Sequence, residues 1–199
     1  MIQEALKFLV DELNQYFSLK LGATTESRVV LGNIARAFDN EGGGSSNNAI
    51  MGKAVLSLVN VEEDKVSKVH ENYVKTINGI KYKNPPVLVN LYVLFSVNRT
   101  DYNDCLKWLS LVIQYFQHRS VFTGDAYPSM NPGIQKMMIE LVSMSFEQVN
   151  HLWGTLGGKY IPSVLYKIRQ LTIDENEITA EGMLIRDIQI NEKLKNPLA

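Results

Sequence analysis

The segment LWGTLGGKYIPSVLYKIRQLTID, residues 152–174, joins three local signals in immediate succession: a helix end, a glycine turn and a strand. Its glycines, Gly154, Gly157 and Gly158, allow the positive φ that ends a helix and turns the chain. Pro162 prevents the helix from continuing and favours an extended conformation at Ile161. The segment therefore predicts a helix that ends before a strand beginning near Pro162.

In that strand, alternate side chains point to opposite faces of a sheet. One face is expected to carry Val164, Tyr166, Ile168 and Gln170, and the other Leu165, Lys167, Arg169 and Leu171.

The composition is that of a soluble globular protein, without the overall excess of positive charge that indicates a polyanion-binding surface, although a local basic patch stays open. The chain has 199 residues, of which 45% are hydrophobic and 21% charged, and this length can bury a substantial core. Twenty basic residues against 21 acidic ones give a net charge of -1. Because nucleic-acid binders usually carry an excess of Lys and Arg, no nucleic-acid partner is expected.

The single cysteine and the N-terminal segment indicate where the protein is made. Cys105 alone can form neither an internal disulfide nor a cysteine-based zinc site, which favours a reducing compartment. Glu4, Asp11 and Glu12 do not fit a secretory signal, and no stretch reaches the roughly 18 apolar residues of a membrane helix. We therefore expect a cytoplasmic protein without direct membrane insertion.

Hydrophobic periodicity predicts about three helices packed on a mostly antiparallel sheet, an α+β fold. Helices are expected at 2–19, at 101–119 and, after the capping-box pair Ser145 and Gln148, over a short segment near 146–153. Strands are expected at 28–35, 51–60, 87–97, 135–144, 163–174 and 183–190, with a hairpin over 73–83. We expect a single domain over residues 1–199 with a flexible loop near 39–49.

The expected buried stripes follow from the same periodicity. In the first helix they comprise Ile2, Ala5, Leu6, Leu9, Val10, Leu13 and Phe17. In the second helix they comprise Leu106, Leu109, Val112 or Ile113, and Phe116.

No motif in the sequence assembles a catalytic, metal or cofactor site. The glycine segment ending in Gly158-Lys159 lacks the earlier glycine of a P-loop and has Tyr160 where that motif needs Ser or Thr. The histidines have no metal-ligand spacing, and Cys105 is expected to be a small buried hydrophobe. We therefore predict a protein that is not an enzyme and needs no cofactor.

Three groups of residues together resemble a known family. They are Pro86-x-x-x-Asn90-Leu91-Tyr92, then Tyr102-x-x-x-Leu106 in a helix ending Tyr115-Phe116-Gln117, and Leu152-Trp153-x-x-Leu156-Gly157-x-Lys159-Tyr160-x-Pro162-Ser163-x-x-Tyr166-x-x-Arg169. This pattern, which extends over roughly residues 2–190, is similar to the N-terminal domain of tail-terminator, or cap, proteins of extracellular contractile injection systems of the antifeeding-prophage type.

The resemblance implies a structural protein that forms a sixfold ring at the distal end of the inner tube and sheath and sets their length. Its partners would be other copies of itself and the sheath and tube proteins of a particle that is either released or membrane-anchored. Interfaces favour Arg and Tyr. The candidate subunit contacts in the last motif are Lys159, Tyr160, Ser163 and Arg169.

Several alternatives stay open at the level of sequence. Tyr160 and Tyr166 could simply pack in the core, with Lys159 solvated. An exposed sheet edge could accept an extended arm of a sheath subunit by strand addition. The chain could also be another ring component, of the baseplate or the tube, or a small-molecule-binding or enzymatic α+β domain whose site is scattered along the sequence.

Overall fold

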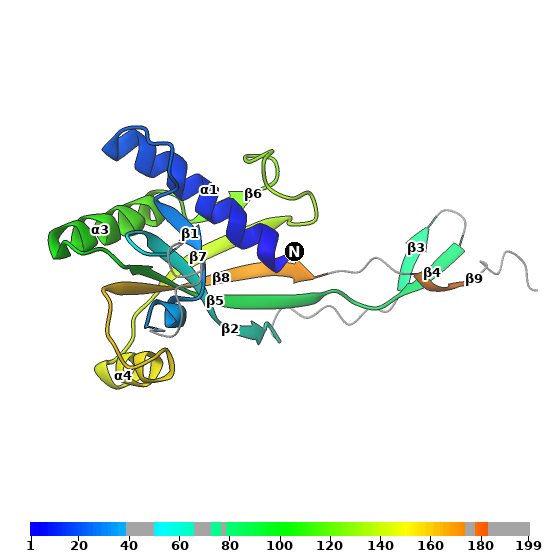
Figure 1. Ribbon diagram of the computed structural model, residues 1–199. Helices are drawn as coiled ribbons and strands as arrows, with labels where there is room; N and C mark the ends of the chain where they lie inside the picture. Colours follow the sequence, from blue (N-terminus) through cyan, green and yellow to red (C-terminus); the bar gives the residue numbers. More distant parts are fainter. Residues whose placement is uncertain (39–49, 66–72, 77–78, 174–177, 183–199) are drawn as a thin grey trace, which may run out of the picture. The chain divides into compact units, whose positions relative to one another are not determined.

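The computed structural model describes residues 1–38, 50–65, 73–76, 79–173 and 178–182 (Figure 1). They belong to two compact units, one of Met1–Lys68 with Val87–Ile173 and the other of Val69–Pro86 with Asp174–Ala199. The single-domain organisation expected over residues 1–199 stays a prediction. The loop expected near 39–49 lies outside the described residues, as does the strand expected at 183–190.

The larger unit is built on a six-stranded sheet with the strand order β1-β2-β5-β8-β7-β6. The strands are β1 (Val29–Leu31), β2 (Ala54–Glu63), β5 (Val87–Val97), β6 (Val121–Thr123), β7 (Lys136–Val142) and β8 (Ser163–Ile173). Only β1 and β2 pair in parallel, while the other neighbours are antiparallel. The α+β class with a mostly antiparallel sheet is therefore confirmed.

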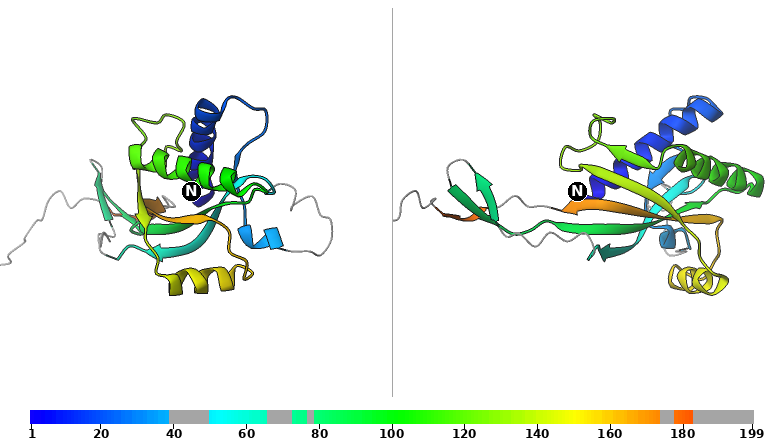
Figure 2. Two further views of the ribbon diagram at one scale, coloured as in Figure 1. Left: turned by 90° about the vertical axis from the view of Figure 1, so that its left-hand side faces the viewer. Right: turned by 180° about the vertical axis from the view of Figure 1, so that it is seen from behind.

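Helices cover both faces of this sheet (Figure 2). The helix α1 (Ile2–Leu21) and the helix α3 (Tyr102–His118) lie on one face, and α4 (Phe146–Thr155) lies on the other. A short 3-10 helix, η1 (Ile34–Phe38), follows β1. The expected stripe of α1 is confirmed, since its members are buried except Ile2, which is partly buried.

The central position of β5 follows from its apolar composition on both faces, as the sequence predicts. Val89, Leu91, Val93, Phe95 and Val97 join the core beneath α1 and α3. The opposite side of the same strand contributes Leu94 to the second core, where Trp153 of α4 is buried. Because both faces of β5 are apolar, the strand packs against one core on each side.

The turn between α4 and β8 forms as the sequence predicts. Ser145 and Gln148 form the capping box that begins α4, with each side chain accepting a hydrogen bond from the backbone N–H of the other. After α4, Gly157 and Gly158 have φ values of 114° and 77°, which favour glycine. The Gly158 N–H donates to the Trp153 carbonyl at 2.7 Å and closes the helix end.

One expectation about β8 is wrong, because the strand contains a bulge. Gln170 has a positive φ of 66°, and the pairing with β5 shifts at this point, from Leu91 opposite Ile168 to Val89 opposite Leu171. The extra residue reverses the alternation of side chains beyond it. Leu171 therefore lies in the same core as Ile168, and not on the face of Leu165.

The buried stripe of α3 also differs from the expected one. Its buried residues are Cys105, Trp108, Leu111, Val112, Tyr115 and Phe116. Leu106, a member of the expected stripe, is 44% exposed. Of the two alternatives for the third position, Val112 is buried and Ile113 is 38% exposed. The helix is apolar around most of its circumference, so periodicity alone could not choose the buried side. Contacts of Trp108 with Phe17 and of Phe116 with Phe95 orient it.

Smaller differences occur at strand ends and surfaces. The expected strand at 28–35 is limited to β1, because the chain then enters η1. Leu58, Leu141 and Phe146 are large apolar residues that the structure leaves exposed. In β2 a shift in pairing between Leu58 and Asn60 interrupts the alternation.

The smaller unit contains a three-stranded antiparallel sheet with the order β3-β4-β9. Its strands are β3 (Tyr73–Thr76), β4 (Gly79–Lys83) and β9 (Ile178–Gly182). The pairing of β3 with β4 agrees with the hairpin expected over 73–83. The sequence pattern did not predict β9.

Candidate subunit-contact surfaces

Lys159, Tyr160 and Ser163 lie close together in the sequence between the glycine turn and the first residues of β8. Lys159 and Tyr160 are exposed, and Ser163 is half-buried opposite Ser96 of β5. The carbonyl of Pro162 accepts a hydrogen bond from the Val97 N–H at 3.1 Å, which attaches this segment to the sheet. The turn thus presents two large side chains to solvent from a fixed backbone.

Tyr160 combines a packed side with an exposed side. Its ring meets the buried Trp153 edge-to-face, with centroids 5.8 Å apart, yet 62% of Tyr160 is exposed. Tyr166 instead is buried in the core against Phe95 and Phe116. The pure packing interpretation therefore holds for Tyr166, while Tyr160 has a large surface available for a partner.

Arg169 lies apart from the other three candidates. It is six residues beyond Ser163, about 20 Å along an extended strand. Its guanidinium forms an ion pair with Glu140 of β7 at 3.2 Å, and both side chains are nearly half exposed. The structure therefore places the four predicted residues in two separate surfaces, one at each end of β8.

A charged cluster near Arg169 was missed by sequence reasoning. The Tyr92 hydroxyl donates to Glu62 Oε2 at 2.9 Å, and Lys167 Nζ lies 3.3 Å from the same oxygen and 5.0 Å from the Tyr92 ring centroid. Hydrogen bonds from Tyr92 and then Lys167 hold the pKa of Glu62 below its ordinary value. Since these residues come from three strands, only the register of β2, β5 and β8 brings them together.

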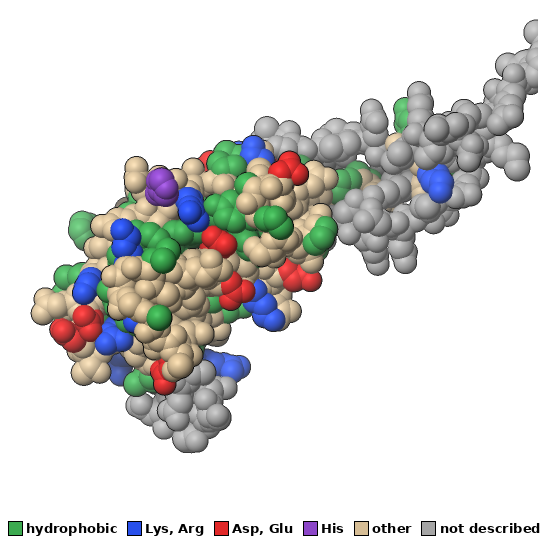
Figure 3. All heavy atoms as spheres, turned by 90° about the horizontal axis from the view of Figure 1, so that it is seen from above, with side chains coloured by type: hydrophobic (Ala, Val, Ile, Leu, Met, Phe, Trp, Pro, Cys, Tyr) green, Lys and Arg blue, Asp and Glu red, His purple; other side chains and the backbone are tan. Residues whose placement is uncertain are grey.

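The outward side of α3 carries an exposed apolar stripe. Tyr102, Leu106 and Ile113 are 60%, 44% and 38% exposed, and Leu109 between them is partly buried. Their spacing of four, three and four residues places them along one line of the helix. In Figure 3, which shows the molecule from above, apolar side chains lie among interspersed charges of both signs. Such a stripe is typical of a helix that contacts a partner.

The sheet also has open edge segments. β1 pairs with β2 only over Ala54–Leu56, so Leu58–Glu63 has a strand partner on one side only among the described residues. Leu58 and Val61 in this segment are more than 40% exposed. Unpaired backbone groups on an edge can bind an added strand.

The described residues contain no group of three or more His, Cys, Asp or Glu side chains that could hold a metal ion. Cys105 is buried, with its thiol 3.4 Å from the Arg99 carbonyl, as a core residue. The segment Gly154–Tyr160 follows a helix and not a strand, unlike a P-loop. No helix in the described part of the chain is long and apolar enough to cross a membrane.

A scan against protein-family models identifies the class of protein. Residues 4–187 match the model described as the Pvc16 N-terminal domain. Because this match extends over most of the chain, the protein belongs to the Pvc16 N-terminal domain family. This agrees with the family that the sequence motifs resemble. No match was found among curated proteins.

Two solved structures share the fold. One is the sheath/tube terminator of the extracellular contractile injection system PVC in its extended state, with a TM-score of 0.59 and 12% identity over 96% of this chain and 65% of that one. The other is the tube-terminating cap of the anti-feeding prophage, with a TM-score of 0.55 and 13% identity over 80% of this chain and 57% of that one. The chain thus spans less than two thirds of either relative.

Proposed function

We propose that this protein is a terminator domain that caps the distal end of the inner tube and sheath of a contractile injection particle, stops their polymerisation and so sets their length. The observation that carries the proposal is the family match over residues 4–187. The shared fold with a sheath/tube terminator and a tube-terminating cap supports the same role.

The surfaces of the described residues suit an assembly role. A closed ring requires two different surfaces that meet between neighbouring copies. The stripe on α3 and the surface around Tyr160 are separate and exposed, so they could form the two sides of such a contact. We propose a homohexameric ring that uses both surfaces together with the separate surface around Arg169, and that acts by binding, without catalysis.

The proposal extends to the neighbouring proteins of the particle. The outer edge of β2 over Leu58–Glu63 is where we place strand addition by an extended sheath arm. The inner tube would meet the ring itself. The protein would be made in the cytoplasm and incorporated there into the particle.

The decisive experiment is imaging of particles assembled without this chain. Loss of the uniform tube and sheath length is expected, with restoration when the gene is supplied again. Tubes and sheaths of normal, uniform length would refute the terminator role. Labelled protein at the baseplate end, instead of the opposite end, would favour a baseplate component, and label along the tube would favour a tube component.

A further inference from the structure

A cleft between the α1–β1 connection and the beginning of α3 has properties that the terminator role does not explain. Its volume is about 470 Å³, and it lies entirely within the larger unit. Its walls come from three segments: residues 21–28, residues 51–53, and Arg99 with the first turns of α3. A cavity of this size can accommodate a small ligand or a few side chains.

The cleft is basic although the chain as a whole is slightly acidic. Four cationic side chains line it, Arg28, Lys53, Arg99 and Lys107, against the two carboxylates of Glu26 and Asp104. The formal balance is 4 − 2 = +2, compared with -1 for the complete sequence. This concentration of charge favours an anionic ligand.

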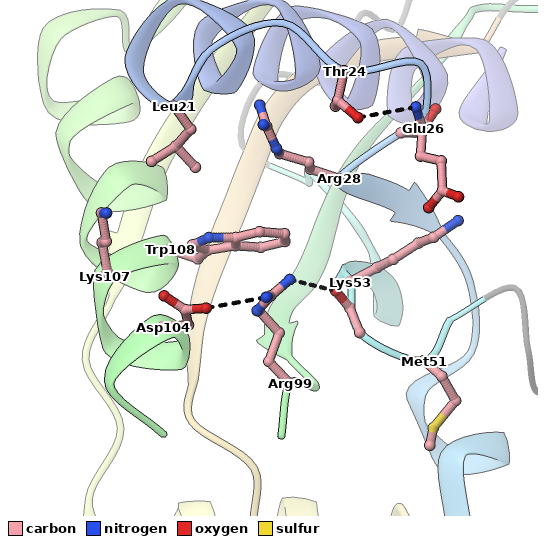
Figure 4. A pocket seen from close by; sticks show the side chains of 12 residues that line it. Leu21, Thr24, Glu26, Arg28, Met51, Lys53, Arg99, Asp104, Lys107 and Trp108 are labelled. Carbon is pink, nitrogen blue, oxygen red and sulfur yellow. Dashed lines mark hydrogen bonds and ion pairs between the residues drawn. The ribbon is translucent and has the colours of Figure 1, made fainter. Parts of the chain in front are cut away.

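Two arginines are held in place before any ligand arrives. The Arg99 guanidinium lies over the Trp108 ring, 4.4 Å from its centroid, and contacts Asp104 at 3.0 Å and the Gly52 carbonyl at 3.2 Å. Arg28 Nη1 donates to the carbonyls of Phe17 and Gly22. In Figure 4 Arg28 and Arg99 approach Trp108 from above and below. Fixed donors lose little conformational freedom on binding.

Part of the positive charge has no acidic partner in the described residues. Arg28 is held by carbonyl oxygens, which do not neutralise it. Neither Lys53 nor Lys107 forms an ion pair with a described carboxylate. The Arg99 Nε is buried without a hydrogen-bond partner in the structure. The Arg99 Nε is out of reach of solvent, so the accessible donors that an incoming carboxylate would meet are those of Lys53 and Lys107.

The lining also distinguishes among anions. Leu21, Met51 and the Trp108 indole provide apolar surface between the cations. A free phosphate has no apolar part that could use this surface, whereas a peptide with acidic and apolar side chains has both. We infer that the cleft binds an acidic peptide segment of another protein, with its carboxylates at Lys53 and Lys107 and an apolar side chain against Trp108. This inference does not depend on the terminator role.

The chain offers a built-in probe for the test, because it has two tryptophans and only Trp108 lines the cleft. The full chain is titrated with a synthetic peptide of alternating Glu and Leu while tryptophan fluorescence is recorded. A saturable change is expected that weakens with added salt and disappears in Trp108→Phe. A peptide of alternating Lys and Leu and inorganic phosphate serve as comparison ligands, and neither is expected to bind with comparable affinity.

The variant Lys53→Gln with Lys107→Gln brings the formal balance of the cleft to zero and should weaken peptide binding about tenfold. The matched control, Lys7→Gln with Lys65→Gln, removes the same charge from lysines that do not line the cleft and should leave binding unchanged. Circular dichroism verifies that both variants fold. The inference is overturned if the peptide does not bind, if phosphate binds as tightly, or if the two double variants behave alike.

Discussion

Replacing Tyr160 or Arg169 with Ala separates a contact role from a folding role, because the structure predicts small folding costs for both. Tyr160 is 62% exposed, so truncation loses only its remaining burial and the edge contact with Trp153, about 1–2 kcal/mol. Arg169 loses a half-exposed ion pair worth about 0–1 kcal/mol. Both costs are small beside a typical free energy of unfolding of about 5–15 kcal/mol.

The cost to assembly should be larger if these residues lie in the subunit contact. A Tyr or Arg that is a hot spot of an interface contributes at least about 2 kcal/mol, roughly a 30-fold change in Kd, and a closed ring repeats the loss at every interface. We therefore expect Tyr160→Ala and Arg169→Ala to fold as monomers that no longer form the ring.

The assay combines sedimentation velocity for the ring with circular dichroism and urea unfolding for the monomer. Arg36→Ala removes an exposed positive charge from η1 and should leave the ring intact. If a variant loses its folded circular-dichroism signal, the residue belongs to the core. If both variants still form the ring as the unmodified chain does, neither side chain is a subunit contact and the reasoning is refuted.

Three further predictions follow from burial and backbone geometry. The double variant Leu106→Asp with Ile113→Asp changes exposed residues and should prevent ring formation while it preserves the fold. Leu111→Asp changes a buried residue of the same helix and should unfold the monomer. Sedimentation reports the ring and circular dichroism the fold. Burial raises the pKa of Tyr166 to about 12, above an unfolded value of about 10. The contribution of the protonated Tyr166 to the free energy of unfolding is therefore complete below pH 10 and is lost as the pH rises from about 10 to about 12. The free energy of unfolding, measured with urea, should decrease between pH 8 and pH 11 by about 1.4 kcal/mol more in the unmodified chain than in Tyr166→Phe. Equal decreases in the two proteins would contradict this. Gln170→Gly should raise the free energy of unfolding by about 0.5 kcal/mol, because glycine tolerates the φ of 66°, and calorimetry showing a lower Tm would oppose it.

The sequence determined those features whose causes are local. The stripe of α1, the capping box of α4 and the glycine turn before β8 depend on residues within a few positions of each other. The apolar run of β5 likewise fixed its place between two cores. Together they were sufficient for the α+β class, whereas the family resemblance rests on the three groups of motif residues.

Only the tertiary structure decided which side of α3 is buried and at which residue the alternation of side chains in β8 reverses. The apolar circumference of α3 allows two stripes, and contacts with Phe17 and Phe95 select the inner one. The bulge at Gln170 depends on pairing with β5, a strand some 80 residues earlier in the chain. The cluster of Glu62, Tyr92 and Lys167 and the basic cleft bring together distant segments, and their spacing in sequence carries no sign of that proximity.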